Sequence, residues 1–229
     1  MSNKNPRKAL ASFGEGTRLS DVAYGRIFEI LYDRRLPAGA LVSQSELVEL
    51  TGVPVGPLRD ALRTLQAEGV LTIHPHTGIQ FMKPGLELTR STYQFRGIIE
   101  AAAVAVFAET AGEVEIAELA LQHRVVESAL EGDGLTAENL RAWEKLEELL
   151  HGSIVASLNN PLIDTSYRRI RNYLRLLRLD RKMSVPLALR SLREHQKIIE
   201  ACRNRDATGA VAALQTHFTA ALQRNLGMY

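Results

Sequence analysis

Apolar residues recur at helical spacing near the start of the chain, and three short helices are predicted there. The first covers residues 20–35, with Val22 and Ile27 on one face. The second begins at Ser43 and ends at Thr51-Gly52, and a third runs to about residue 68. Ser43 and Glu46 have the spacing of a capping box, in which a hydroxyl and a carboxylate satisfy free amides at a helix start.

The hydrophobic period then changes from helical to alternating. Residues 71–81 alternate apolar and polar side chains around the turn-forming run 75–78, and this predicts a β-hairpin. Three helices followed by a two-stranded ribbon are typical of a winged helix-turn-helix. We therefore expect this fold over residues 18–83, preceded by a loose arm of residues 1–17.

The remainder of the chain is predicted to be helical. Asn160 before Pro161 and Asp206 before Ala207 have the chemistry of helix caps. Long helices joined by short turns predict an antiparallel bundle over residues 89–229, after a linker at 84–88. The fold class is mainly α, and the predicted helices of the bundle are 89–110, 114–131, 137–158, 161–182, 186–203 and 207–226.

Composition narrows the class of protein. Hydrophobic residues make up 45% of the chain, which is too many for a disordered protein. The longest apolar run, residues 101–108, is far shorter than the roughly 20 residues of a membrane span, so no membrane is expected. The single cysteine, Cys202, fits a reducing cytoplasm. The net charge of +2 is nearly neutral, so it indicates no particular class of binding partner. If the protein binds nucleic acid, a local part of its surface must do so.

The winged-helix pattern brings candidate DNA contacts with it. A recognition helix needs exposed side chains that enter the major groove, and the third helix presents Arg59 and Arg63 one turn apart. The tip of the hairpin adds His74, His76 and Thr77. The alternative is that Arg59 belongs to an ordinary solvated helix face.

Residues 24–82 resemble the winged helix of the GntR family of bacterial transcription regulators. The resemblance implies that Arg59 contacts an operator in double-stranded DNA, together with Ser45, Pro57 and the wing. In place of the usual Ser/Thr-Arg-Thr segment the chain has Pro54-Val55-Gly56, so Val55 replaces a common DNA-contacting arginine. The matching segments are Leu36-Pro37-Ala38-Gly39-Ala40-Leu41, Ser45-Glu46-Leu47, Gly52-Val53, Pro57-Leu58-Arg59-Asp60-Ala61-Leu62 and Leu65-Gln66-Ala67-Glu68-Gly69-Val70-Leu71.

Three histidines lie among apolar neighbours at helical spacing, whereas His123 is expected on a polar helix face. Glu147 precedes the first of the three by four residues, so both project from one side of a helix. Three imidazoles and one carboxylate suit zinc, nickel or another borderline divalent cation. The alternative is that each imidazole bonds a backbone carbonyl in the core. The candidate ligands are Glu147, His151, His195 and His217.

Residues 89–226 resemble the all-helical ligand domain, called FCD, of the FadR subfamily of GntR regulators. The supporting runs are Glu147-x-x-Leu150-His151-x-x-Ile154, Glu194-His195-x-x-Ile198-Ile199-x-Ala201, Arg205-Asp206-x-x-x-Ala210 and His217. Many members bind a divalent metal through an aspartate and three histidines, and that metal helps to hold a small carboxylate effector. The resemblance implies the same role for the four candidate ligands, with Glu147 in place of the usual aspartate.

A carboxylate effector needs a second cation, preferably a guanidinium. Arg96 is the first candidate, because it shares a helix face with Ile99 and Ala103 and because the family commonly has arginine there. The alternative is a surface ion pair between Arg96 and Glu100. Arg171, on a helix crowded with basic residues, is a second candidate.

The expected function is that of a non-enzymatic transcription regulator. We expect a homodimeric repressor whose binding to its operator responds to a small organic acid at the metal site. In one alternative the metal ion itself is the signal. In another, the three-histidine site is a hydrolase centre.

Overall fold

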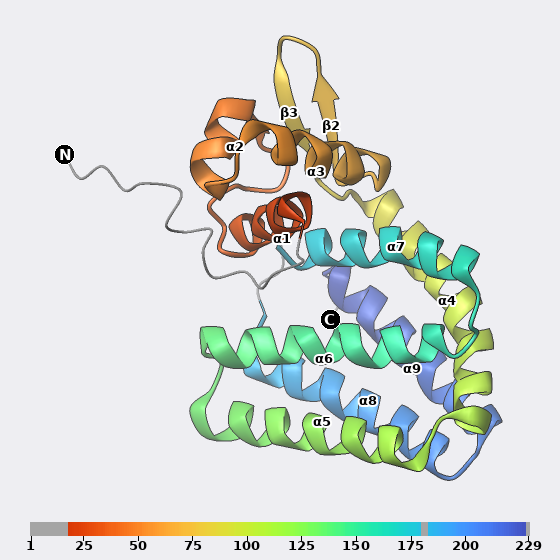
Figure 1. The fold of residues 1–229 in the computed structure, drawn as a ribbon. Helices are drawn as coiled ribbons and strands as arrows, with labels where there is room; N and C mark the ends of the chain where they lie inside the picture. Colours follow the sequence, from red (N-terminus) through yellow and green to blue (C-terminus); the bar gives the residue numbers. More distant parts are fainter. Residues whose placement is uncertain (1–17, 180–182, 228–229) are drawn as a thin grey trace. The chain divides into compact units, whose positions relative to one another are not determined.

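The structure is a computed structural model that describes residues 18–179 and 183–227 (Figure 1). The expected arm at residues 1–17 and the last residues of the helix predicted to end at 182 lie outside that part of the chain. Two compact units are present, and each is described by itself. Among the described residues, the first contains 18–84 and 172–179, and the second contains 85–171 and 183–227.

Three short helices form the first unit, as predicted. They are α1 (Leu19–Tyr32), α2 (Gln44–Thr51) and α3 (Val55–Ala67). The Ser43 hydroxyl caps α2 by accepting a hydrogen bond from the Glu46 amide at 3.1 Å. Gly52 ends α2 with a φ of 65°, a left-handed conformation that glycine adopts without strain.

The predicted hairpin is present, and the structure adds a third strand to it. Strands β2 (Leu71–His74) and β3 (Gly78–Phe81) pair antiparallel, and β1 (Leu41–Val42) pairs with the outer side of β3. Gly78 has a φ of 138°, and a Cβ atom there would lie 2.7 Å from the Val42 carbonyl oxygen. The close approach of β1 to β3 therefore requires glycine at this position.

The core of the first unit is apolar and includes one residue from α7 (Pro161–Leu179). Leu176 packs with buried side chains of all three helices and the sheet. Asn172, also on α7, donates hydrogen bonds to Glu68 Oε2 at 2.7 Å and to the Tyr24 hydroxyl at 3.0 Å. The other core residues include Ile27, Leu47, Leu58, Leu62, Leu65 and Phe81.

The second unit is a bundle of helices close to those predicted. Asn160 and Asp206 cap α7 and α9 as expected. The side-chain oxygen of Asn160 accepts a hydrogen bond from the Leu162 amide at 3.0 Å, and the carboxylate of Asp206 accepts one from the Gly209 amide at 2.8 Å. The expected linker at 84–88 is partly wrong, because α4 already begins at Leu86. Besides α7, the helices are α4 (Leu86–Thr110), α5 (Glu113–Asp133), α6 (Ala137–Ala156), α8 (Val185–Arg203) and α9 (Ala207–Asn225).

Charged and imidazole side chains are buried inside this bundle. Such groups are rarely buried in proteins unless they are paired or bind a ligand. The exposed fraction is 2% or less for Arg96, Glu100, His123, His151, His195 and His217. No helix within the described ranges is long and apolar enough to span a membrane.

Candidate metal centre

Four potential donors from three helices meet inside the second unit. Glu147 and His151 lie one turn apart on α6, His195 lies on α8 and His217 on α9. One ligand atom from each lies within 4.8 Å of those of the others, and all four residues are buried. The structure therefore brings together the four candidate ligands that the sequence analysis singled out.

Two of the histidines are oriented by carboxylates. Nδ1 of His151 lies 2.6 Å from Glu100 Oε2, and Nδ1 of His217 lies 2.9 Å from Glu194 Oε2. Because an ionised carboxylate only accepts hydrogen bonds, each Nδ1 carries a proton, and in the neutral ring each Nε2 then carries the lone pair. Among the described residues, these two Nε2 atoms and that of His195 are buried without a hydrogen-bond partner.

Glu100 is held ionised by cationic and polar neighbours on three helices. Its Oε1 accepts hydrogen bonds from Arg96 Nε at 2.6 Å and from the Tyr167 hydroxyl at 2.9 Å. Burial alone would raise the pKa of Glu100, but the charge of Arg96 and the hydrogen bonds from Arg96 and His151 lower it to about 2. Glu100 is therefore a permanent acceptor for His151.

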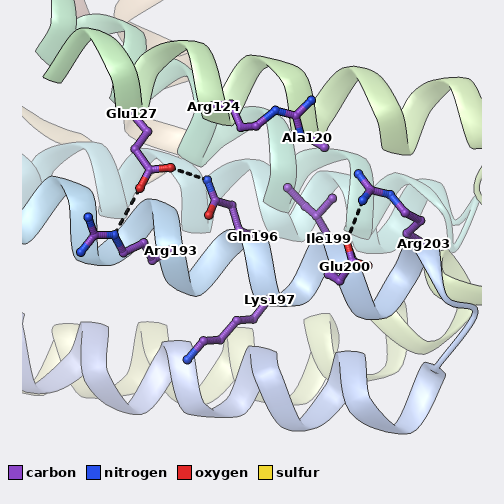
Figure 2. A pocket seen from close by; sticks show the side chains of 9 residues that line it. All are labelled: Ala120, Arg124, Glu127, Arg193, Gln196, Lys197, Ile199, Glu200 and Arg203. Carbon is purple, nitrogen blue, oxygen red and sulfur yellow. Dashed lines mark hydrogen bonds and ion pairs between the residues drawn. The ribbon is translucent and has the colours of Figure 1, made fainter. Parts of the chain in front are cut away.

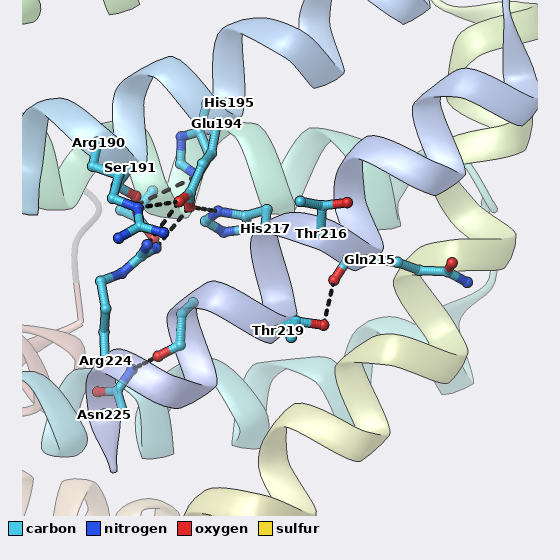
Figure 3. Close-up of polar contacts among 12 residues, drawn as sticks. Arg190, Ser191, Glu194, His195, Gln215, Thr216, His217, Thr219, Arg224 and Asn225 are labelled. Atoms are coloured by element: carbon cyan, nitrogen blue, oxygen red, sulfur yellow. Dashed lines mark hydrogen bonds and ion pairs between the residues drawn. The ribbon is translucent and has the colours of Figure 1, made fainter. Parts of the chain in front are cut away.

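Glu194 has a similar environment at the other end of the cluster (Figure 3). Arg224 donates two hydrogen bonds of 2.7 Å to its two carboxylate oxygens. Burial opposes ionisation, but the hydrogen bonds from Arg224 and His217 lower the pKa of Glu194 to about 2. The donor residue Glu147 is itself positioned by Ser191, whose hydroxyl donates to Oε1 at 2.6 Å.

Two of the cluster's histidines, His151 and His195, have pKa values below the ordinary range for imidazole. Burial lowers the pKa of His151 to about 4, against the opposing charge of Glu100. Burial also lowers the pKa of His195 well below its ordinary value. Metal binding requires neutral imidazole, so these side chains are already in the protonation state that a divalent cation needs.

The two effector candidates lie in different surroundings. Arg96 pairs with Glu100 as the alternative reading expected, but the pair is buried rather than on the surface. Its guanidinium lies 4.4 Å above the Phe218 ring, and its Nη2 is buried with no hydrogen-bond partner in the described part of the chain. Arg171 is half-buried and lines a groove of about 440 Å³ between α6 and α7, beside Tyr167.

A second groove, of about 520 Å³, lies between α5 and α8 (Figure 2). Its walls carry charged side chains, and none of the four donors lines it. Glu127 on α5 accepts hydrogen bonds there from Arg193 Nε at 3.2 Å and Gln196 Nε2 at 2.6 Å, both on α8. These contacts link the two helices beside the cluster.

The first unit exposes the side chains expected to contact DNA. Arg59 and Arg63 are exposed on α3, and Arg59 Nε donates to Gln44 Oε1 at 3.2 Å. Val55, at the start of α3, is 42% exposed. Among the other candidates Pro57 is half-buried, while the exposed ones are Ser45 and the wing residues His74, His76 and Thr77.

Comparison with protein families assigns both units. Residues 19–81 match the model of the bacterial regulatory proteins of the gntR family, and residues 91–220 match the FCD domain. The chain belongs to the GntR family. Members of this family are DNA-binding transcriptional regulators, so this FCD-containing GntR protein is a transcriptional regulator and not an enzyme.

Relatives of this GntR regulator share its length and fold. An uncharacterized HTH-type transcriptional regulator of Bacillus subtilis (strain 168), YdhC, is 23% identical over 195 residues, which is 85% of each chain. The structure assigned to a transcriptional regulator GntR from Rhodococcus sp. RHA1 is 19% identical, with a TM-score of 0.75 over 93% of this chain and 100% of that one. E. coli McbR/YncC is 18% identical, with a TM-score of 0.75 over 93% and 99%.

Several residues of the site in this GntR regulator were not found by sequence reasoning. The expectation that His123 lies on a polar helix face is wrong, because its side chain is fully buried. Leu119, Val126 and Leu130 are buried at helical spacing from it, and this signal was present in the sequence. Only the pairing of Glu100 with Arg96 had a local signal, in their i,i+4 spacing. The contact of Glu100 with His151 and those of Glu194 with His217 and Arg224 join different helices, so they had none.

Proposed function

We propose that this regulator binds operator DNA through its winged helix and that a small organic acid, held at a divalent metal in the FCD domain, modulates that binding. The observation that carries the proposal is a set of three buried Nε2 atoms beside Glu147, for which the described residues provide no hydrogen-bond partner. Buried polar atoms are normally satisfied, so such a set calls for an electrophilic ligand.

The donor chemistry fits zinc or nickel. Neutral imidazoles and one carboxylate are ligands that both ions accept. Glu147, His151, His195 and His217 would hold the ion, and Ser191, Glu100 and Glu194 would orient three of these four. When bound, the metal supplies positive charge and an open position that an effector carboxylate can occupy.

Arg96 is the protein cation best placed to assist an anionic effector. Its Nη2 is buried and has no hydrogen-bond partner among the described residues. Because Glu100 already neutralises Arg96, the guanidinium can offer a directional hydrogen bond without leaving a buried charge unpaired. Arg171, in the groove beside Tyr167, is the second candidate for contacts with the effector.

On the DNA side, the proposal assigns base reading to α3 and phosphate contacts to the wing. Arg59, Arg63, Ser45 and Pro57 form the helical part, and the wing part is His74, His76 and Thr77. We further propose that the regulator is a homodimeric repressor, with a DNA-binding domain at 18–83 and an effector and dimerisation domain at 89–229. Light scattering would give twice the chain mass of 25.4 kDa for a dimer.

The test is DNA binding measured with and without zinc and a panel of small carboxylic acids. The duplex is selected from a random-sequence pool by the full chain, and affinity is measured by fluorescence anisotropy. We expect at least one acid to change the affinity only when zinc is present, and His195→Ala to remove that response while retaining DNA binding. An affinity that follows zinc without any acid would make the ion itself the signal, and a response to neither would contradict the proposal.

A further inference from the structure

A fourth buried histidine, His123 on α5, contacts the candidate ligand His195. Its side chain is fully buried, and its Nε2 lies 3.2 Å from Nδ1 of His195 on α8. Its other nitrogen, Nδ1, lies 2.7 Å from the Leu119 carbonyl oxygen one turn earlier on α5. The two rings meet edge to face, with centroids 5.3 Å apart.

These two contacts determine where the protons lie. A carbonyl oxygen can only accept, so His123 Nδ1 must carry the proton that bonds Leu119. In a neutral ring, His123 Nε2 is then the acceptor, and His195 Nδ1 must donate to it. His195 Nε2 is left with a lone pair, 3.4 Å from Glu147 Oε1, and has no hydrogen-bond partner within residues 18–179 and 183–227.

His195 differs in this respect from the other two histidines of the cluster. His151 and His217 donate to carboxylates, and each carboxylate is itself bound by an arginine. His123 bonds a backbone carbonyl through Nδ1 and the His195 ring through Nε2, and neither partner is a carboxylate. The acceptor that orients His195 is therefore a neutral imidazole, which brings no negative charge. The Nδ1 proton of His195 is therefore held by the His123 ring rather than by a carboxylate.

The position of His123 against α8 is held by contacts one turn along α5. Glu127 accepts hydrogen bonds from Arg193 and Gln196 of α8, on either side of His195 in the sequence (Figure 2). These contacts fix the position of α5 along α8, and with it the position of the His123 ring relative to the His195 ring. A hydrogen bond between imidazoles is sensitive to such register, because its geometry falls off steeply with distance and angle.

We propose that His123 is a positioning residue that holds His195 in the tautomer with its Nε2 lone pair free for the metal. This inference rests on the proposed function, in which the four donors bind a divalent cation. Residues that orient ligating histidines in this way typically contribute about 10- to 100-fold to metal affinity.

The test compares two substitutions at position 123 in the full chain. His123→Phe keeps a buried ring but removes the acceptor, whereas His123→Gln keeps an acceptor at the reach of the imidazole Nε2. Zinc affinity is measured on chelator-treated protein by competition with a chromophoric chelator. We expect His123→Phe to weaken zinc binding by about 10- to 100-fold and His123→Gln by less than about threefold.

Val126→Ala is the matched control, because it perturbs the same buried face of α5 at a side chain that cannot accept a hydrogen bond from His195. Its zinc affinity is expected to equal that of the unmodified protein. If His123→Phe binds zinc as tightly as Val126→Ala does, His123 has only a packing role and the inference is overturned.

A second measurement tests the tautomer without any metal. Imidazole ¹⁵N shifts of metal-free protein, assigned with His195→Ala, are expected to show protonated Nδ1 and unprotonated Nε2 for His195. A protonated Nε2 at His195 would overturn the inference even if the position-123 variants fail to fold. Absence of zinc binding by the unmodified protein would instead contradict the proposed function, and the ¹⁵N shifts would still decide the role of His123.

Discussion

At the scale of single residues, buried charge around the cluster is balanced side chain by side chain. Arg96 is matched by Glu100, and Arg224 by Glu194, with contacts of 2.6 and 2.7 Å. Each carboxylate also accepts from a histidine of the cluster. The same ion pairs that keep the carboxylates charged therefore orient the imidazoles, and stability and ligand geometry depend on the same atoms.

Glu100→Gln is predicted to destabilise the protein strongly. The substitution keeps the shape of the side chain but leaves Arg96 buried without its counter-charge, which typically costs about 3–5 kcal/mol. Urea denaturation of the metal-free protein measures the change, with the exposed Glu115→Gln on α5 as control. A loss below about 1 kcal/mol, the size expected for an exposed pair, would show that the buried charges are not coupled as described.

Acid is predicted to destabilise the metal-free protein through His151. This ring faces Glu100, Arg96 and His217, and burial lowers its pKa from 6.5 to about 4. Between these values the unfolded chain binds more protons than the folded one, so the free energy of unfolding falls as the pH is lowered. From pH 7 to pH 4.5 the loss from His151 alone reaches about 2 kcal/mol, because the slope of about 1.4 kcal/mol per pH unit applies in full only well between the two pKa values.

Urea denaturation at the two pH values measures this loss, and Glu100 and Glu194 remain ionised throughout because their pKa values are about 2. His151→Gln keeps a donor toward Glu100 but cannot titrate, and its stability should vary less with pH. Equal pH dependence in the two proteins would contradict the assignment to His151.

Residue type and spacing were enough to predict which four side chains cluster inside the bundle, but not which residues orient them. Glu147 and His151 lie four apart on one helix, and His195 and His217 each have apolar neighbours at helical spacing, so inward faces could be inferred. Which side chain each imidazole meets on its other nitrogen depends on how α4, α5 and α8 pack. Only His123 carried a usable signal, in the buried leucines and valine at helical spacing around it.

At the scale of elements, the ends of helices were the most predictable feature. Ser43, Asn160 and Asp206 each cap a helix as expected, because side-chain capping is a local interaction. Strand β1 was not predicted, since two residues are too few to show alternation and their pairing with β3 is a long-range contact. The start of α4 was placed too late because no side-chain cap marks it.

The recognition helix α3 carries a prediction of its own. Arg59→Ala is expected to weaken binding to the selected duplex by about 1–3 kcal/mol and to relax base preference at one position. Fluorescence anisotropy and repeated selection from a random pool measure the two effects. Arg203→Ala on α8 is the control and should leave affinity unchanged. Equal binding by both variants would place base reading elsewhere, for example in the wing.

At the scale of the whole molecule, the candidate metal centre joins α6, α8 and α9. Because an ion bound there ties three helices together, zinc is predicted to stabilise the folded protein. At a free zinc concentration about 100 times Kd, the free energy of unfolding should rise by about 2.7 kcal/mol. Thermal denaturation with and without zinc measures the effect. His217→Ala should lose it, whereas His74→Ala in the wing should keep it.

The most direct test of the metal centre is an anomalous difference map from a crystal grown with zinc, recorded across the zinc absorption edge. We expect one strong peak per chain inside the bundle, about 2.0–2.2 Å from the Nε2 atoms of the three histidines and from a carboxylate oxygen of Glu147. A peak bound through Nδ1 atoms, or zinc bound only elsewhere on the protein at saturating concentration, would contradict it.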